Sequence, residues 1–328
     1  MARGARRAGI DVGGTKCLAV VLDEHDAVVA LERRTTIYDG DAVLATIEGL
    51  LGAVGPFDSV GIGVAGLVNR SGVLRAGPNL GTVRELDVMA SISARLGLPV
   101  AVDNDATCAA MAEWHLGAAR GASDAVLVTF GTGIGGAVIA GGRLQHGANG
   151  FAGEPGHMVV DPNGPSCVCG RRGCWERYAS GAGLARWANE PDRAAALRIV
   201  LRHDAAQPLR GEDVVAAARV GAPVALGIID DFARWAALGL VNLTNLLDPE
   251  LIVVGGGLAE SCEVWLAPVK RWFGQLLYAP EHRRHPHIVV AELGERAGAI
   301  GAALLGPQAL FPTDLGERPS GQPMPGPW

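Results

Sequence analysis

The feature of this sequence that most constrains its fold is an internal repeat of two glycine-rich segments. Residues 11–21 and 129–139 each run from a short apolar strand through a cluster of glycines into a second strand-like segment. Because no helical period follows the glycines, each copy is predicted to be a β-hairpin. A P-loop or a Rossmann turn would lead into a helix. Each hairpin continues into a third strand, near 27–33 and 143–145, so the repeat predicts two related α/β halves that each open with a β-meander.

The bulk properties describe an ordered protein with room for two domains. The chain has 328 residues, of which 49% are hydrophobic and 19% charged. A net charge of −6 argues against nucleic acid as the main partner, and no apolar run is long enough to span a membrane. The basic start, residues 1–7, is followed by a polar segment and not by a signal-peptide core. We therefore expect a cytoplasmic protein whose six cysteines are metal ligands or buried thiols, not disulfides.

Further elements follow from local patterns. We expect strands at 60–65, 99–102, 251–254 and 288–293, and helices at 106–116, 224–246 and 297–305. Leu86, Met89, Ile92 and Leu96 have helical spacing and predict another helix, which Gly97 ends. The tail beyond Gly306-Pro307 is rich in Pro and Gly and is predicted to be disordered.

The first glycine turn, Gly13-Gly14-Thr15-Lys16, has two interpretations. Backbone N–H groups of such a turn can approach a phosphate closely, and Thr15 and Lys16 add a hydroxyl and a positive charge. The alternative is a tight hairpin turn with no ligand. A second copy and a third turn at 255–257 favour the phosphate interpretation. Asp11 supports it, because a carboxylate at the end of an apolar strand is costly to bury without a metal or a hydrogen-bonding partner.

The segment Asp103-Asn104-Asp105 stands where a buried strand meets a helix. Ligands of open α/β sheets sit at the carboxyl ends of strands, which makes Asp105 a candidate general base. The alternative is that Asn104 or Asp105 only caps the helix, but a cap explains one of the three polar residues. Asn79 is a weaker candidate for binding a polar ligand, because a residue after Pro78 is often a simple turn residue.

One cluster has the composition of a closed zinc site. It consists of His157, Cys167, Cys169 and Cys174, which are the ligand types and the number that tetrahedral structural zinc requires. Surrounding Gly and Pro suit a tight loop better than the alternative of buried thiols and a core histidine. Glu154 and Glu176 bracket the cluster, so a folded metal loop would fix both carboxylates at a polar pocket.

Together, four motifs resemble the ROK family (repressors, open reading frames and kinases), and within it the bacterial glucokinases. They are Asp11 to Lys16, Val102 to Ala106, Gly131 to Gly136, and Gly153 to His157 with the cysteine cluster. The resemblance runs in order from Gly9 to Gly306. It implies an actin-like sugar-kinase fold with two duplicated α/β domains and an interdomain cleft. The expected divisions are 9–117 completed by 297–306, 118–296 with the zinc loop, and a disordered tail at 307–328.

The same resemblance implies a role for each site residue. Asp105 is the expected catalytic base. The residues expected to contact the sugar are Asn79, Asn104, Asp105, Glu154, His157 and Glu176. The residues expected to hold the nucleotide are Gly13, Gly14, Thr15, Lys16, Thr132, Gly133 and Gly256, with Mg²⁺ near Asp11 through water. His157, Cys167, Cys169 and Cys174 are expected to bind structural zinc, and a homodimer or higher homo-oligomer is the expected assembly.

The implied reaction is ATP-dependent phosphorylation of glucose at its 6-hydroxyl. Thr107 stands where the family often has Asn, and Pro155 where glucokinases often carry a bulkier apolar residue, which leaves sugar specificity open. The alternatives are a kinase of another hexose, an N-acetylated or amino sugar, or a cyclitol. Polyphosphate is a further possible donor. A remote alternative is a sugar-sensing regulator, whose DNA-binding segment would precede the first glycine motif, where eight residues stand before Gly9.

Overall fold

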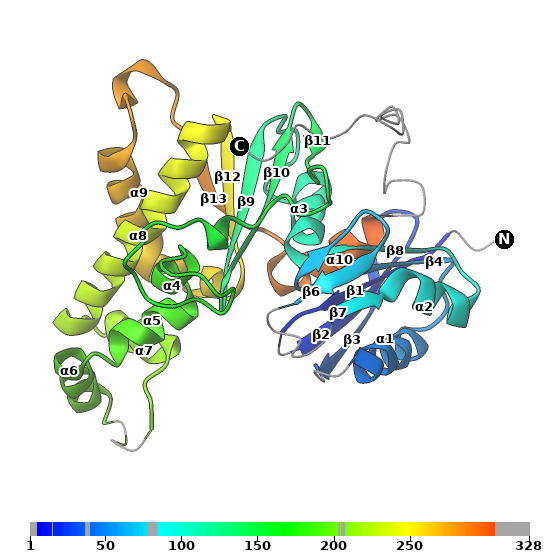
Figure 1. Cartoon of the computed structure of the whole chain (residues 1–328), viewed down its shortest axis with the longest axis horizontal. Helices are drawn as coiled ribbons and strands as arrows, with labels where there is room; N and C mark the ends of the chain where they lie inside the picture. The colour runs from blue at the N-terminus through cyan, green and yellow to red at the C-terminus, as the bar shows by residue number, and fades with distance from the viewer. Residues whose placement is uncertain are drawn as a thin grey trace, which may run out of the picture.

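The protein has two lobes, each built around one mixed β-sheet (Figure 1). The computed structural model describes residues 5–14, 16–36, 40–77, 84–202, 204 and 207–305. In Figure 1 the first lobe, mostly blue and cyan, lies on the right, and the second lobe, green to orange, lies on the left. Thr15, Asn79 and the tail at 307–328 lie outside the described residues, so what the sequence predicts for them stays a prediction.

The first lobe contains, within the described ranges, a five-stranded sheet in the order β3–β2–β1–β4–β8. Its strands are β1 (Arg7–Val12), β2 (Lys16–Leu22), β3 (Val28–Thr35), β4 (Ser59–Val64) and β8 (Val100–Asn104). The first three strands form an antiparallel meander, whereas β4 and β8 continue the sheet in parallel with β1. Val12 pairs with Cys17 across the glycine turn, which confirms the first predicted hairpin.

The second sheet repeats this topology. Its order in the described chain is β11–β10–β9–β12–β13. The strands are β9 (Ala125–Phe130), β10 (Ile134–Ala140), β11 (Arg143–Leu144), β12 (Leu251–Gly255) and β13 (His287–Val290). Again an antiparallel meander is followed by two parallel strands, and Phe130 pairs with Ile134 across the second glycine turn. The two related α/β halves predicted from the repeat are therefore confirmed.

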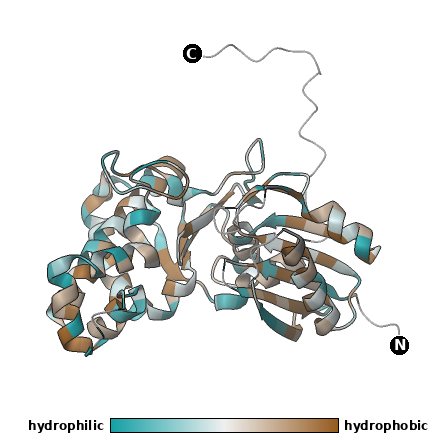
Figure 2. Ribbon diagram, turned by 60° about the horizontal axis from the view of Figure 1, so that its bottom comes forward, coloured by the Kyte–Doolittle hydropathy of each residue, from teal (hydrophilic) through white to brown (hydrophobic). Residues whose placement is uncertain are grey.

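Helices cover both faces of the first sheet. Alternate residues of β2 point to opposite sides: Cys17, Ala19 and Val21 join one core cluster, and the residues between them join another. On the first side lie α1 (Gly40–Val54) and α2 (Val88–Leu96). On the second side lie α3 (Asp105–Leu116) and α10 (Ala297–Leu304). The hydropathy colours follow this arrangement, with apolar residues concentrated along the strands (Figure 2). A sheet buried on both faces matches the near-continuous apolar sequence of these strands.

Helix α10 comes from the far end of the described chain and packs on the first sheet. A Cβ atom at Gly9 would lie 2.0 Å from the carbonyl oxygen of Ala299, and one at Gly61 only 1.7 Å from that of Ala302. Both strands therefore need glycine where the helix backbone crosses them. The small residues of α10 allow this close approach. The residue boundaries between the two domains stay a prediction.

The second lobe packs a layer of helices against its sheet. They are α4 (Glu176–Ala179), α5 (Gly181–Ala188), α6 (Pro191–Leu201), α7 (Gly211–Arg219), α8 (Pro223–Leu247) and α9 (Cys262–Leu276). Four buried aromatic side chains, Phe130, Trp175, Phe232 and Trp265, contribute to the core between them. None of the described helices, α8 included, combines the length and the apolarity that a membrane span needs.

The two connections between the lobes meet at one buried carboxylate. Glu113 on α3 is 0% exposed. Its oxygens accept hydrogen bonds from the N–H groups of Ala118 (2.9 Å), Glu292 (3.1 Å) and Leu293 (2.8 Å). Ala118 lies on the connection from α3 to β9, and the other two lie on the connection from β13 to α10. A buried charge satisfied by three backbone donors fixes the point at which the chain passes between lobes.

Two elements differ most from those that the sequence predicts, and the other predicted boundaries shift by one or two residues. Leu86 lies in β7 (Arg84–Asp87), part of a small sheet with β5 (Leu67–Val68) and β6 (Val73–Ala76), and not in the following helix. Helix α2 begins at Val88 because the Asp87 carboxylate accepts the N–H of Ala90 and caps it. Strand β13 ends at Val290, short of the predicted 293. The Ala291 N–H still bonds to the carbonyl of Val254 in β12, but the N–H groups of Glu292 and Leu293 bond to Glu113 instead of a strand.

Candidate active site

The first glycine turn places Asp11 at the junction of the lobes. The turn is closed by hydrogen bonds from the Gly13 N–H to the Lys16 carbonyl (3.1 Å) and from the Thr36 hydroxyl to the Gly13 carbonyl (2.7 Å). Asp11 stands one residue before the end of β1, and a Cβ atom at Gly298 of α10 would lie 2.7 Å from its carboxyl carbon. Within the described structure, its buried Oδ1 atom has no hydrogen-bond partner. Burial, reinforced by nearby Asp105, raises the pKa of Asp11 to about 8.

Lys16 points to a different partner from the one that the sequence suggests. Its Nζ lies 2.7 Å from Glu295 Oε2, and the Arg33 guanidinium bonds to the other oxygen of Glu295. The hydrogen bond from Lys16 lowers the pKa of Glu295. All three side chains are partly exposed, so this is a weak contact that a competing anion can displace.

The segment after β8 combines a helix cap with a buried carboxyl. The Asn104 side chain accepts the N–H of Thr107 (3.0 Å) and donates to the carbonyl of Gly66 (3.1 Å). Asn104 is therefore the cap, which leaves Asp105 at the first position of α3 for another purpose. Asp105 accepts the N–H of Ala106, and burial raises its pKa. The cap interpretation is therefore confirmed for Asn104, and the role of Asp105 as a general base stays a prediction.

Asp103, the third polar residue of this segment, binds a histidine that the sequence analysis did not single out. Its Oδ2 lies 2.7 Å from Nε2 of His146, and its Oδ1 accepts the N–H of Asn104 at 2.8 Å. His146 follows β11 in the second lobe, 43 residues away. No local pattern marks His146, because its partner lies on the other lobe.

Three backbone segments meet at the second glycine turn. The Gly131 N–H donates to the Gly133 carbonyl (2.9 Å), and the Gly181 N–H at the start of α5 donates to the Gly131 carbonyl (2.7 Å). Gly256 has φ of 80°, and a Cβ atom there would lie 2.5 Å from the carbonyl oxygen of Phe130. The turn that holds Thr132 and Gly133 is thus packed between α5 and the glycine turn after β12. Position 256 requires glycine because of both its positive φ and this close approach to Phe130.

Glu154 lies on the loop that crosses β10. It precedes a short 3₁₀ turn, Pro155–His157. The Pro155 ring lies against Gly136, where an added Cβ atom would be 2.7 Å from the Cγ atom of Pro155. Pro155 therefore packs against the second glycine hairpin and fixes the loop there. Burial first, and then the charges of Asp105 and Glu176, raise the pKa of Glu154 to about 7.

Glu176 connects the cysteine cluster to the second glycine turn. Its Oε1 lies 2.9 Å from Cys167 Sγ and 3.9 Å from His157 Nδ1. A Cβ atom at Gly133 would lie 2.7 Å from its Oε2. One carboxylate therefore touches both the predicted metal loop and the predicted phosphate loop.

The four predicted zinc ligands come together. The ligand atoms of His157, Cys167, Cys169 and Cys174 all lie within 4.8 Å of one another. The Cys169 and Cys174 sulfurs are 3.5 Å apart, and Cys167 Sγ lies 3.8 Å from His157 Nδ1. Tetrahedral zinc with Zn–S bonds of about 2.3 Å needs sulfurs roughly 3.8 Å apart, so this cluster fits the ion.

Four carboxyls thus form a chain of neighbours between the lobes. Asp11 and Asp105 come from the first lobe, and Glu154 and Glu176 from the second. The charge of Asp105 raises the pKa of Asp11 and of Glu154, and the charge of Glu176 also raises the pKa of Glu154. Such a chain offers many acceptors for hydroxyl groups and for a cation, and few donors.

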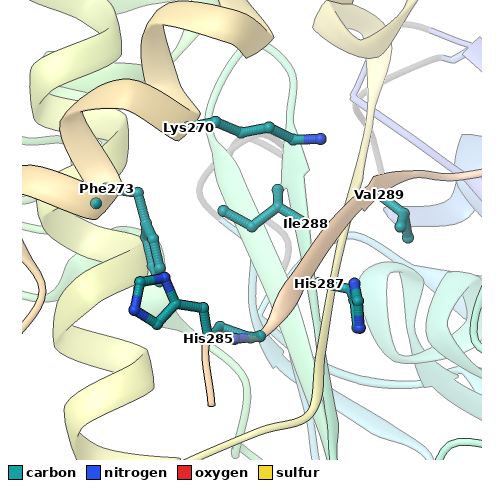
Figure 3. A pocket seen from close by; sticks show the side chains of 8 residues that line it. Lys270, Phe273, His285, His287, Ile288 and Val289 are labelled. Carbon is teal, nitrogen blue, oxygen red and sulfur yellow. The ribbon is translucent and has the colours of Figure 1, made fainter. Parts of the chain in front are cut away.

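A groove elsewhere on the second lobe takes no part in this arrangement. It encloses about 370 Å³ between α9 and β13, and Figure 3 shows Lys270 and Phe273 facing His285, His287 and Ile288 across it. None of the residues lining it is one of the site residues predicted from the sequence. The groove belongs to the outer edge of the second sheet.

Comparison with known proteins gives this architecture a family. The model of the ROK family matches residues 7–309. The chain is 38% identical to a glucokinase of Streptomyces coelicolor over 306 residues, 90% of this chain and 95% of that protein. It is 33% identical to an N-acetylmannosamine kinase of Citrobacter koseri over 309 residues, 90% and 97% of the two chains.

A solved structure supports the same assignment. The crystal structure of a ROK family glucokinase from Streptomyces griseus in complex with glucose and AMPPNP superposes with a TM-score of 0.84 and 37% identity, over 93% of this chain and all of that one. The duplicated sheets, with the carboxyl chain at their junction, define an actin-like ATPase fold. The chain belongs to the ROK family.

Proposed function

We propose that this protein is an ATP-dependent sugar kinase that transfers the γ-phosphoryl group of ATP to the 6-hydroxyl of glucose. The observation that carries the proposal is the carboxyl chain, which joins a glycine turn of each lobe to the loop at Glu154. The likeness to a glucokinase that binds glucose and AMPPNP supports the same substrates. Phosphoryl transfer depends mainly on positioning and charge stabilisation, and a site between two lobes supplies both.

Asp105 is the proposed general base. Its raised pKa makes it a better proton acceptor than an exposed carboxylate. As the sugar 6-oxygen forms its bond to the γ-phosphorus, its proton passes to Asp105 and the bond to the β-phosphate oxygen breaks, releasing ADP. General-base help of this kind is worth about 10²–10⁴-fold in rate.

The remaining polar residues orient the sugar. Asn104 already uses its amide oxygen as the helix cap and one amide N–H to bond the Gly66 carbonyl, so its second N–H remains for a sugar hydroxyl. Glu154 and Glu176 accept sugar hydroxyls in this proposal, with Asn79 completing the set. His157 faces the cysteine cluster with Nδ1, which leaves Nε2 to donate to the sugar.

The glycine turns hold the nucleotide. The proposed phosphate contacts come from Gly13, Gly14, Thr15, Lys16, Thr132 and Gly133, and Gly256 lies beside the nucleotide. Lys16 exchanges Glu295 for phosphate when ATP binds. The unpaired Oδ1 of Asp11 fits an Mg²⁺ ion or its bound water, and that ion would neutralise charge on the triphosphate.

Zinc bound by His157, Cys167, Cys169 and Cys174 would be structural, because four protein ligands leave no open position. The cluster then fixes His157 directly, and Glu176 lies at its border, with Oε1 2.9 Å from Cys167 Sγ. A homodimer or higher homo-oligomer in the cytoplasm completes the proposal.

N-acetylmannosamine is the main alternative to glucose as the substrate. The N-acetylmannosamine kinase relative is nearly as similar as the glucokinases, so the family likeness alone favours neither sugar decisively. Pocket shape around the ring decides between them. The test is a coupled ADP-release assay with Mg·ATP against glucose, mannose, fructose, N-acetylglucosamine and N-acetylmannosamine. A separate assay of sugar phosphate formation, with polyphosphate in place of ATP, tests the second donor. The highest kcat/KM with glucose and ATP supports the proposal, and a higher value with another sugar replaces glucose as the substrate.

A further inference from the structure

A loop of the second lobe reaches across to the first lobe beside the candidate active site. We call residues 145–153 the bridging loop; it starts after β11 and ends next to Glu154. His146 in this loop places Nε2 2.7 Å from Asp103 Oδ2 on β8 of the other lobe. The Asp103 side chain is only 5% exposed and that of His146 17%. A charged acceptor that is this well buried makes a hydrogen bond stronger than a surface ion pair.

Further contacts hold the bridging loop against the first lobe. The Arg70 guanidinium donates from Nε to the Gly147 carbonyl at 3.1 Å. Gly150 has φ of 91°, and a Cβ atom there would lie 2.9 Å from the carbonyl oxygen of Val68. The Ala152 N–H donates to the His146 carbonyl at 3.0 Å and closes the loop on itself. The bridging loop is therefore a folded segment that lies on the β5–β6 hairpin.

Both ends of the Asp103–His146 contact lead directly to site residues. Asp103 Oδ1 accepts the N–H of Asn104 at 2.8 Å, and Asp105 is the next residue along the chain. On the other side, the bridging loop ends at Gly153, where a Cβ atom would lie 2.5 Å from the carbonyl oxygen of Gly136. Glu154 follows at once. The contact thus spans the gap between the lobes, with the proposed base on one side and a proposed sugar ligand on the other.

We infer that Asp103 and His146 form a positioning pair that holds the sugar-binding loop at Glu154 in place against Asn104 and Asp105. The inference rests on the proposed sugar kinase function. Neither side chain is required to touch the substrate. Without His146, the buried Asp103 Oδ2 loses a partner and the bridging loop loses an anchor, so the sugar ligands of the two lobes are no longer held together. The nucleotide contacts lie on the glycine turns and are not tied to this pair.

The test compares His146→Ala, His146→Gln and the matched control His282→Ala. His282 is an exposed histidine in the connection between α9 and β13, and its Nε2 lies 3.6 Å from Glu281. His146→Ala should raise the KM for the sugar about tenfold, equal to about 1.4 kcal/mol, and change the KM for ATP less than about twofold. His146→Gln should restore most of the loss, because its amide N–H can donate to Asp103. The control should match the wild type.

The outcomes separate this inference from the proposed function. An unchanged sugar KM in His146→Ala, with only a lower Tm, would make the pair purely structural and overturn the inference. A wild type that phosphorylates no sugar would overturn the proposed function instead. Hydrogen exchange of the backbone amides in the same variants then tests the Asp103–His146 pair. Faster exchange at 103–106 together with 146–154 in His146→Ala supports the positioning link. Unchanged exchange at 103–106 overturns it.

Discussion

Asp11 and Glu154 are carboxyls whose burial works against their ionisation. Each lies near another carboxyl, and their pKa values rise to about 8 and about 7. In the unligated protein this arrangement costs stability when the groups ionise, which is typical of sites that a bound cation or ligand completes. Binding of a cation or ligand at these residues is therefore expected to stabilise the folded protein.

The pH dependence of stability should report this cost. A carboxyl whose pKa is raised in the folded state holds its proton more tightly there, so its stabilising contribution is complete at acidic pH and is lost as pH rises through the raised pKa. Without ligand, the free energy of unfolding should fall as pH rises to about 8. Asp11→Asn should remove part of this fall and be more stable than the wild type by about 1–3 kcal/mol at pH 9. Thermal unfolding across pH measures both; a parallel pH profile in the two proteins would contradict the assignment.

For individual residues, the sequence predicted which side chains belong to the candidate site better than it predicted which residues they contact. Asp105, Glu154 and the cysteine cluster stand in short motifs, where local spacing carries the information. The partner of Lys16 is Glu295, 279 residues away, and that of Asp103 is His146 on the other lobe. Tertiary packing creates such pairs, so no local spacing indicates them.

Among the elements, the central helices α3 and α10 make a very close backbone contact. A Cβ atom at Gly301 of α10 would lie 1.6 Å from the carbonyl oxygen of Cys108 on α3. Since α3 begins with Asp105, the position of the proposed base depends on how closely these helices approach. The meanders and these two helices were predictable, because strand and small-residue patterns are local. Helices α4 to α7 and α9 were not predicted, because no motif marked them.

Substituting Gly301 should separate the two helices. Gly301→Ala is expected to lower the free energy of unfolding by about 1–3 kcal/mol, because the added methyl group overlaps a backbone carbonyl. Gly274→Ala in α9 is the matched control, since nothing lies within 4 Å of a Cβ atom there. In a helix interior that change should stabilise by roughly 0.5–1 kcal/mol. Denaturant unfolding measures both, and equal effects would refute the close contact.

The cysteine loop should depend on metal for its structure. We predict about one equivalent of zinc per chain by elemental analysis, because the four ligands make one tetrahedral site. Cys174→Ser should lose the metal, lower Tm and raise the KM for the sugar more than that for ATP, since His157 and Glu176 border the cluster. Cys262→Ser in α9, outside the cluster, should retain the zinc. Full activity in a protein free of zinc would remove the metal from the account.

The whole molecule is organised by duplication and by the buried junction at Glu113. The same strand order occurs in both sheets, and the carboxyl chain lies where they meet. Both connections between the lobes bond to Glu113, which no motif indicated because its partners are backbone N–H groups from separate parts of the chain. Relative motion of two lobes is the ordinary expectation for such an architecture, and this junction is its natural pivot.

Replacing the junction carboxylate should weaken the whole fold. Glu113→Gln keeps the size of the side chain but places an N–H₂ group where one oxygen accepts a backbone donor. The free energy of unfolding should fall by roughly 1–3 kcal/mol. Glu292→Gln removes the same charge from an adjacent position and should change stability by less than about 0.5 kcal/mol. Calorimetry measures both, and an unaffected Tm in Glu113→Gln would rule out the junction.

The most direct test of the central claim is steady-state ADP release with glucose and Mg·ATP, measured on the wild type and on Asp105→Asn. We expect turnover by the wild type, a loss of about 10²–10⁴-fold in kcat in the variant, and a glucose affinity by calorimetry that changes little. Near-wild-type turnover in Asp105→Asn would contradict the assignment of Asp105 as the base. Absence of turnover by the wild type with any sugar would contradict the kinase itself.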